Sequence, residues 1–391
     1  MVEGRSVPPS GRILCWGTYD TSKPRSRILR DGLRAVGVTL VECHASLWER
    51  IQDKSQFSGI LPRVMLLLRW LVSYPSLLWR FMRMPKPDVV LVGYPGMLDV
   101  IVLWPWARLR RVPIVWDMFI SLYDTVVQDR ALLTRNNWVA RLLHSVEGWA
   151  VRLADLVFLD TAAHARHVER IYRLEEQRCE SVWVGAEPVF FEPLSVRGDV
   201  GARQDGTLRV LFYGQFIPLH GIETIIAAAR ATRGDAIQWQ LIGRGQEAAR
   251  IRALLAETPL PLLHWTEWLE YPELRQALAG ADVCLGIFGS SEKAACVIPN
   301  KVFQILAAGR PLITRDSPAI RELLQHAPPC VRLIEAGNPQ ALVEAVREHL
   351  HSRTPSAAAC HEGLRERFAP PAIARQFLEM LQRTRLGWRM S

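Results

Sequence analysis

The sequence predicts an α/β protein with two Rossmann-like domains, each built on a parallel sheet. A chain of 391 residues is longer than one typical hydrophobic core and fits two domains of ordinary size. Two series of short apolar segments alternate with stretches rich in Ala, Leu, Arg and Glu, over residues 12–192 and 208–350. These segments are continuous rather than alternating, as strands covered by helices on both faces should be. With 49% hydrophobic and 22% charged residues, the chain is globular.

Each apolar segment marks a predicted strand. The strands expected in the first series are 13–16, 38–41, 89–92, 114–116, 156–159 and 181–184. Those expected in the second series are 210–213, 238–242, 262–265, 283–288, 312–314 and 331–333.

A polar segment divides the two series. Residues 195–206 contain glycine and show no periodicity, which is typical of a linker. We therefore expect an N-terminal domain at 1–194 and a second domain at 207–370. The last segment, 371–391, begins a helix after two prolines and could belong to either domain.

The net charge of +9 indicates an anionic partner but does not identify which kind. Surplus Arg and Lys could serve nucleic acid, anionic lipid head groups or a phosphorylated small substrate. A nucleic-acid binder ranks last, because no recognition motif accompanies the charge and the tryptophans are spread out rather than interleaved with basic residues. The chain also lacks GxxxxGK[ST], so it is no P-loop NTPase.

The cysteines favour a reducing compartment. They show no CxxC pair and no metal-ligand spacing with histidine, so reduced thiols in the cytosol are the default expectation. The first residues lack the apolar core of a secretory signal, which also favours the cytosol. The seven positions are Cys15, Cys43, Cys179, Cys284, Cys296, Cys330 and Cys360.

Residues 60–84 form the most apolar long segment of the chain. Several arginines interrupt it, and Pro62 and Pro75 are expected to break it, so it does not reach the roughly 20 apolar residues of a spanning helix. Arginines beside Trp, Leu and Phe predict one or two helices lying on an anionic membrane surface. An ordinary core helix with a few exposed arginines is the alternative.

The segment 290–317 is the most informative part of the sequence for chemistry. Pro299 suits the start of a helix, and Asn300 and Lys301 then lie beside amides without partners inside that helix. An anion is favoured at such a position, and Lys293 adds a second positive charge. A plain helix-to-strand junction with solvated lysines would produce the same pattern.

Two further loops are predicted at the same edge of this sheet. Gly214 and Gly221 follow one strand, and glycine permits close approach of the backbone to a phosphate. Gly243 and Arg244 follow the next strand. Open α/β sheets bind ligands at the carboxyl ends of their strands, so the three loops together predict a phosphate site.

With these motifs the chain resembles the GT-B glycosyltransferases, specifically the retaining family 4 enzymes known as group 1 glycosyltransferases. The resemblance covers nearly the whole chain and is clearest in YGQFIPLHGIETIIAAA, QLIGRGQ and PNKVFQILAAGRPLIT. It implies two Rossmann-like domains facing a cleft, with the nucleotide sugar held mainly by the second and the last helix crossing back to the first. It implies no cofactor besides the nucleotide diphosphate sugar, which is the donor substrate.

The resemblance also assigns the donor-side residues, with departures. The Arg and Lys of the family's first donor loop correspond to Gln215 and His220, so Lys293, Lys301 and Arg244 would supply the charge. Of the family's pair of glutamates, the second corresponds to Gln304, which can still bond a ribose hydroxyl. The first corresponds to Cys296, and Glu292 could replace it if the loop is shifted.

On the acceptor side, the resemblance points to the first strand and the fourth. The loop after the first strand begins with Gly17 and Thr18. Where the family often has a histidine after the fourth strand, this chain has none, and Asp117 is the candidate for contacting sugar or acceptor hydroxyls. Asp124 is a second candidate, and for both the alternative is a helix cap.

No metal site is predicted. His164 and His167 are three residues apart in a predicted helix, but without a third ligand we expect them on the surface.

The sequence therefore predicts a metal-independent retaining glycosyltransferase of the hexosyltransferase type. Its partners would be a nucleotide sugar, a lipid-linked or glycan acceptor and an anionic membrane, with the protein peripheral on the inner face of the cell membrane. Two alternatives stay open: a GT-B nucleotide-sugar epimerase, and a non-catalytic GT-B partner protein that has lost its acidic residues.

Overall fold

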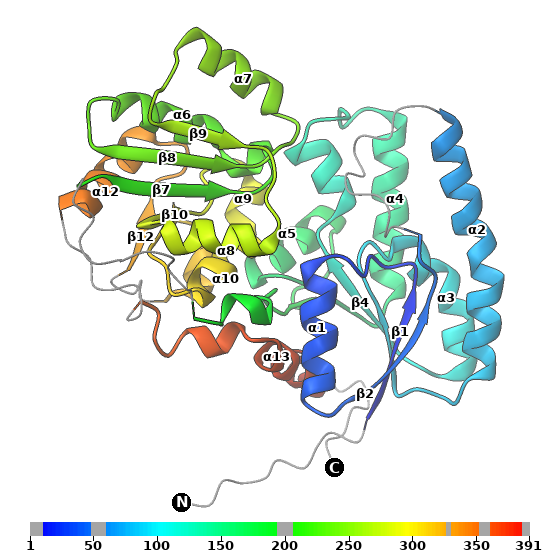
Figure 1. Ribbon diagram of the computed structural model, residues 1–391. Helices are drawn as coiled ribbons and strands as arrows, with labels where there is room; N and C mark the ends of the chain where they lie inside the picture. Colours follow the sequence, from blue (N-terminus) through cyan, green and yellow to red (C-terminus); the bar gives the residue numbers. More distant parts are fainter. Residues whose placement is uncertain (1–10, 48–59, 194–205, 326–329, 352–359, 385–391) are drawn as a thin grey trace, which may run out of the picture. The chain divides into compact units, whose positions relative to one another are not determined.

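The computed structural model describes residues 11–47, 60–193, 206–325, 330–351 and 360–384, apart from some side chains at the start of the helix 60–83. The described chain forms two compact units, each an α/β layer structure around one parallel six-stranded sheet (Figure 1). The first unit holds Met1–Val184 and Pro370–Ser391, and the second holds Gly185–Ala369. The predicted fold class is confirmed. The predicted linker lies, except for Gly206, outside the described residues.

The first unit has the sheet order β2-β1-β3-β4-β5-β6. Its strands are β1 (Arg12–Gly17), β2 (Thr39–His44), β3 (Val89–Val92), β4 (Ile114–Phe119), β5 (Leu156–Leu159) and β6 (Cys179–Ser181). Its helices are α1 (Pro24–Ala35), α2 (Ile60–Arg83), α3 (Met97–Arg110), α4 (Trp138–Leu153), α5 (Ala162–Tyr172) and α13 (Pro370–Arg383). A short π-helix, η1, spans Asp124–Asp129.

The core of the first unit is built from the apolar runs of its strands. Trp16 of β1 and Trp116 of β4 are fully buried beside Phe81 of α2. The helix α13 packs on α1. Gly32 makes this contact possible, because a Cβ at that position would lie 2.0 Å from the carbonyl oxygen of Pro370. The last helix is thereby fixed to the first one.

The helix α2 is continuous, although the sequence predicts that prolines break it. Pro75 lies inside the helix and removes one backbone hydrogen bond. Buried Tyr74, Leu77 and Phe81 hold both sides of Pro75 against the core and compensate for that loss. Among the described residues, no helix is long and apolar enough to cross a membrane.

The second unit has the sheet order β12-β11-β10-β7-β8-β9. Its strands are β7 (Leu208–Tyr213), β8 (Ile237–Ile242), β9 (Leu263–Thr266), β10 (Val283–Leu285), β11 (Leu312–Arg315) and β12 (Val331–Ile334). Its helices are α6 (Ile222–Ala231), α7 (Ala248–Glu257), α8 (Tyr271–Gly280), α9 (Glu292–Cys296), α10 (Asn300–Ala307), α11 (Pro318–Leu323) and α12 (Pro339–His351). One turn of 3₁₀ helix, η3 (Pro218–His220), precedes α6.

Two predicted strands continue past the point where the observed ones end. The strand predicted at 181–184 is observed as β6, which ends at Ser181, and the following residues run to the unit boundary. The strand predicted at 283–288 is observed only as far as Leu285. There the backbone of Gly286 comes so close to Thr314 that a Cβ would lie 2.2 Å from its hydroxyl oxygen.

The expectation that all cysteines are reduced is wrong for one pair. Cys330 and Cys360 form a disulfide with their Cα atoms 5.7 Å apart. It joins the start of β12 to the segment that leads toward α13. The other five cysteines form no disulfide among the described residues, and all five are buried.

Candidate functional site

Three loops of the second unit meet at the carboxyl ends of its strands. The loop after β7 bonds to the loop after β8, where the amide of Phe216 donates to the carbonyl of Arg244 at 2.9 Å. It also bonds to the loop after β10. There the backbone amide of Phe288 donates to the backbone carbonyl of His220, and the amide of Gly289 donates to the carbonyl of Leu219. The three loops therefore form one connected surface at the predicted edge.

Glycines are required where these loops approach one another. A Cβ on Gly243 would lie 2.0 Å from the carbonyl oxygen of Gly214. Gly221 has a φ of 64° at the N-cap of α6, a conformation that residues with a Cβ rarely adopt. The loop after β7 consequently keeps bare backbone in front of the site.

Lys301 lies in the first turn of α10 and is buried, with 4% of its surface exposed. Its Nζ has no hydrogen-bond partner in the part of the chain that the structure describes, and it lies 3.6 Å from the ring centroid of Phe212. Burial holds the pKa of this amine well below its usual value, because the charged form has lost its water. An anion at this point would restore the ammonium.

His220 lies beside Lys301. A Cβ on Gly214 would lie 3.1 Å from the His220 ring and 3.4 Å from Nζ of Lys301, so both side chains reach the Gly214 backbone. Nδ1 of His220 is hydrogen-bonded to the carbonyl of Gln215. Burial, and then the nearby Lys301, hold the pKa of His220 well below its usual value. Gln215 contributes its backbone to this arrangement.

Gln304 lies one turn further along α10 and faces a carboxylate that the sequence analysis missed. Its Nε2 donates to Glu187 at 3.0 Å, and its Oε1 accepts from the hydroxyl of Tyr213 at 3.2 Å. The hydroxyl of Tyr271 donates to the same Glu187 at 2.6 Å. Glu187 is buried, so a neutral glutamine on α10 satisfies a negative charge supplied by another segment.

The other predicted donor-side residues have different surroundings. Lys293 is buried in α9, whereas Glu292 at the start of that helix is exposed. Cys296 is buried, and Asn300 is half-buried at the start of α10. The guanidinium of Arg244 is exposed and lies 5.3 Å from the ring centroid of Trp268.

In the first unit, the predicted acceptor-side residue Asp117 is engaged in a buried ion pair. Both of its oxygens accept from Nε of Arg25, at 3.1 and 3.0 Å. Arg25 also donates to the carbonyl of Val182 at 2.5 Å. Burial raises the pKa of Asp117 although Arg25 opposes the shift. Asp117 is therefore held within β4, which continues to Phe119, and its carboxylate is engaged by Arg25.

Thr18 and Gly17 form part of a buried network around Asp99. The amide of Thr18 donates to Asp99 at 2.7 Å, and the hydroxyl of Tyr74 donates to it at 2.7 Å. The indole of Trp70 donates to the Thr18 hydroxyl at 2.9 Å. A Cβ on Gly17 would lie 2.3 Å from Asp99, so glycine is required there. This network fixes the loop after β1.

The two family comparisons match this architecture unit by unit. The model described as Glycosyl transferase 4-like domain matches residues 12–185, and the model described as Glycosyl transferases group 1 matches residues 207–352. The chain belongs to the group 1 glycosyltransferases. As a member, it transfers a sugar from a nucleotide sugar.

Solved structures share the fold of this glycosyltransferase at low identity. HepE from Anabaena with UDP is 12% identical with a TM-score of 0.65, covering 95% of this chain and 100% of that one. The same protein has been solved with UDP-glucose, also at a TM-score of 0.65. Sucrose-phosphate synthase from Thermosynechococcus elongatus is 16% identical with a TM-score of 0.68, covering 95% and 98%. No curated protein matches the sequence.

The expectation that His164 and His167 lie on the glycosyltransferase surface is wrong. Both are buried on α5, and each faces a carboxylate. Nδ1 of His164 lies 2.6 Å from Asp160, and Nε2 of His167 lies 3.4 Å from Asp124. Asp160 precedes His164 by one helical turn, a spacing visible in the sequence. In the described part of the glycosyltransferase, no group of three or more His, Cys, Asp and Glu could hold a metal ion.

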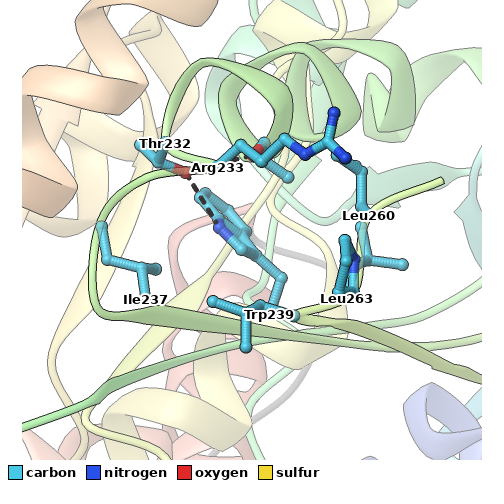
Figure 2. A pocket seen from close by; sticks show the side chains of 9 residues that line it. Thr232, Arg233, Ile237, Trp239, Leu260 and Leu263 are labelled. Atoms are coloured by element: carbon cyan, nitrogen blue, oxygen red, sulfur yellow. Dashed lines mark hydrogen bonds between the residues drawn. The ribbon is translucent and has the colours of Figure 1, made fainter. Parts of the chain in front are cut away.

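An apolar pocket of about 90 Å³ lies away from the three loops of the glycosyltransferase. Figure 2 shows Ile237 at the start of β8 and Trp239 lining it, with the Trp239 indole bonded to Thr232. Because it lies at the amino end of β8, the pocket is at the opposite edge of the sheet from Lys301.

Proposed function

We propose that this glycosyltransferase moves a hexosyl group from a nucleotide diphosphate sugar to a lipid-linked or glycan acceptor, with retention of configuration and without a metal ion. The observation that carries the proposal is the buried Lys301 amine, which has no hydrogen-bond partner among the described residues and lies beside the bare backbone of Gly214. Burying such a group without a partner destabilises a fold. A bound diphosphate would supply the missing negative charge.

The chemistry of the step explains why the charge lies there. When the glycosidic bond breaks, the departing diphosphate gains negative charge, and fixed positive groups around it stabilise the transition state. Lys301, the first amides of α10 and the amides after Gly214 would take this role, with Lys293 adding charge. These groups would do what a metal ion does elsewhere, which is why we propose metal independence. The leaving phosphate would accept the proton of the acceptor hydroxyl.

For the donor, we propose that Gln304 and Glu187 hold the ribose hydroxyls of the nucleotide. A carboxylate and an amide side by side offer both acceptors and a donor to a diol. UDP and UDP-glucose are the first ligands to test, because HepE of the same fold was solved with both. On the acceptor side, Asp117 remains our candidate for contacting hydroxyls, oriented by Arg25.

We also propose that the acceptor is reached at the cytoplasmic face of a membrane. The helix α2 supports this location because Leu68, Leu71, Val72 and Trp79 are all more than half exposed. Exposed apolar side chains interspersed with arginines suit an anionic lipid surface.

One observation favours a second candidate, a non-catalytic protein that only binds a nucleotide sugar. The positions of the family's two glutamates hold the buried Cys296 and the neutral Gln304. Against it, the chain keeps both Lys293 and Lys301 together with a complete first unit on the acceptor side. An epimerase would instead release a modified nucleotide sugar.

The test is a mass-spectrometric screen of the full chain against nucleotide diphosphate sugars, with and without a membrane lipid extract. We expect release of a nucleoside diphosphate and addition of one sugar to a lipid. Lys301→Ala should lower turnover on the order of 10²–10³-fold. Lys86→Ala, a lysine exposed in the first unit, is the matched control and should leave turnover unchanged. Donor binding without turnover would favour the non-catalytic protein.

A further inference from the structure

Large apolar side chains are exposed on three consecutive helices of the first unit, well beyond the segment that the sequence analysis identified. Val72 on α2 is 74% exposed, Leu109 on α3 is 69% exposed and Trp138 on α4 is 73% exposed. Exposed apolar patches of this kind mark interaction sites. The complete set, which we name the three-helix face, is Met65, Leu68, Leu71, Val72, Trp79, Met82, Trp106, Leu109, Trp138, Val139, Leu142 and Trp149.

The three helices that carry this face are held together. The helix α3 contacts both α2 and α4. Arg110 at the end of α3 donates to the carbonyls of Phe81 and Met84 at the end of α2, the second bond at 2.9 Å. Figure 1 shows α2, α3 and α4 as neighbouring helices of the first unit. The exposed side chains therefore belong to one rigid layer.

The charges on these helices have one sign. Their acidic residues are Asp99 and Glu147, and both are buried and hydrogen-bonded. Every exposed charged side chain described on α2, α3 and α4 is an arginine: Arg69, Arg80, Arg83, Arg108, Arg141 and Arg152. The guanidinium of Arg83 lies 4.8 Å from the ring centroid of Trp79, so charge and apolar surface alternate at close range.

This combination suits an anionic bilayer better than a protein. A second copy of the chain, related by a two-fold axis, would bring arginines against arginines on the same face. Tryptophan prefers the head-group level of a membrane, where its ring is in apolar surroundings and its N–H reaches water. Arginine stems can lie along the same apolar surface while their guanidinium groups contact lipid phosphates.

We propose that α2, α3 and α4 together lie against an anionic lipid bilayer, with Trp106, Trp138 and Trp149 as interfacial anchors and the exposed arginines on the lipid phosphates. The inference extends the contact to α3 and α4 and rests on the proposed function only for the place of the acceptor. Binding to lipid can be measured without any sugar transfer.

The experiment is co-flotation of the full chain with vesicles of phosphatidylcholine, alone or mixed with phosphatidylglycerol. We expect binding to the anionic vesicles that weakens as salt rises. Trp138→Ser with Trp149→Ser should lower the partition coefficient about tenfold or more, since each indole loses interfacial burial. Trp268→Ser is the matched control, because this tryptophan is 61% exposed in the second unit, and it should bind as the wild type does.

Three results would overturn the proposal. They are absence of binding to anionic vesicles, unchanged binding of the Trp138 and Trp149 double variant, and a dimer in solution that this variant abolishes. If the double variant fails to fold, brominated phosphatidylglycerol added to the wild type decides, because contact should quench tryptophan fluorescence and its absence contradicts the account. A protein that binds UDP normally but does not bind vesicles would contradict the membrane contact and not the proposed sugar transfer. A protein that binds vesicles but not UDP would contradict the proposed sugar transfer and not the membrane contact.

Discussion

Nζ of Lys301 lies 3.6 Å from the ring centroid of Phe212, and the amine has no hydrogen-bond partner in the described part of the chain. The aromatic face gives some electrostatic stabilisation to an ammonium, but far less than an anion would. The second unit thus holds a buried amine, which an anionic ligand would convert to the charged form. Stability and pH dependence should both reveal it.

Lys301→Met should stabilise the ligand-free protein at neutral pH. The folded state holds the pKa of Lys301 below its usual value of 10.5, so between these two values the unfolded chain binds more protons than the folded one. The contribution of Lys301 to the stability of the wild type therefore rises with pH through that window and is constant, at its least favourable, below it. Thermal melting across pH should show this slope in the wild type and a weaker slope in the methionine variant. A variant that melts at a lower temperature at every pH would contradict the account.

UDP binding should take up protons. A diphosphate beside Lys301 and His220 favours their charged forms, and both have lowered pKa values in the ligand-free protein. Affinity should fall as pH rises, and the binding enthalpy should depend on the ionisation enthalpy of the buffer. Calorimetry in two buffers at one pH measures the uptake. His220→Asn should reduce it at slightly acid pH, and an uptake of zero in the wild type would remove both groups from the phosphate site.

The carboxylate of Glu187 and the amide of Gln304 should be exchangeable only when both residues are changed together. The single variant Gln304→Glu places two carboxylates about 3 Å apart, where like charges repel strongly. The single variant Glu187→Gln leaves the Tyr271 hydroxyl facing an amide. Both should lose stability and UDP affinity, and the double variant should recover much of each. Melting temperature and UDP affinity of the four proteins form the test, and a double variant worse than both singles would exclude the exchange.

Breaking the ion pair between Arg25 and Asp117 should destabilise the first unit. Both groups are buried, and removing one partner of a buried pair costs roughly 3–5 kcal/mol. Asp117→Asn should therefore unfold at lower denaturant concentration while the second unit still binds UDP. Asp88→Asn, an exposed carboxylate of the same unit, is the control. A stable Asp117→Asn variant without transfer activity would assign the carboxylate to the reaction itself.

The sequence predicted the sheets because continuous apolar runs such as 89–92 leave few alternatives. It predicted the lysines and glycines of the strand-end loops as candidates, and the structure brings Lys301, Gly214 and His220 together. It did not reveal Glu187, which reaches Gln304 from a distant loop, nor the Cys330–Cys360 disulfide, since spacing along the chain says nothing about distance in space. Asp160 precedes His164 by one helical turn, and this spacing indicates a possible buried pair. The surrounding sequence is typical of a surface helix, which is why His164 was expected to be exposed.

Sugar transfer is tested by measuring release of nucleoside diphosphate by the wild type and by Lys301→Ala, with each donor sugar and a membrane lipid extract. We expect the wild type to add one sugar to a lipid and the alanine variant to do so on the order of 10²–10³-fold more slowly, with its fold intact. Equal turnover of the two proteins, or donor binding by the wild type without any transfer, would contradict it.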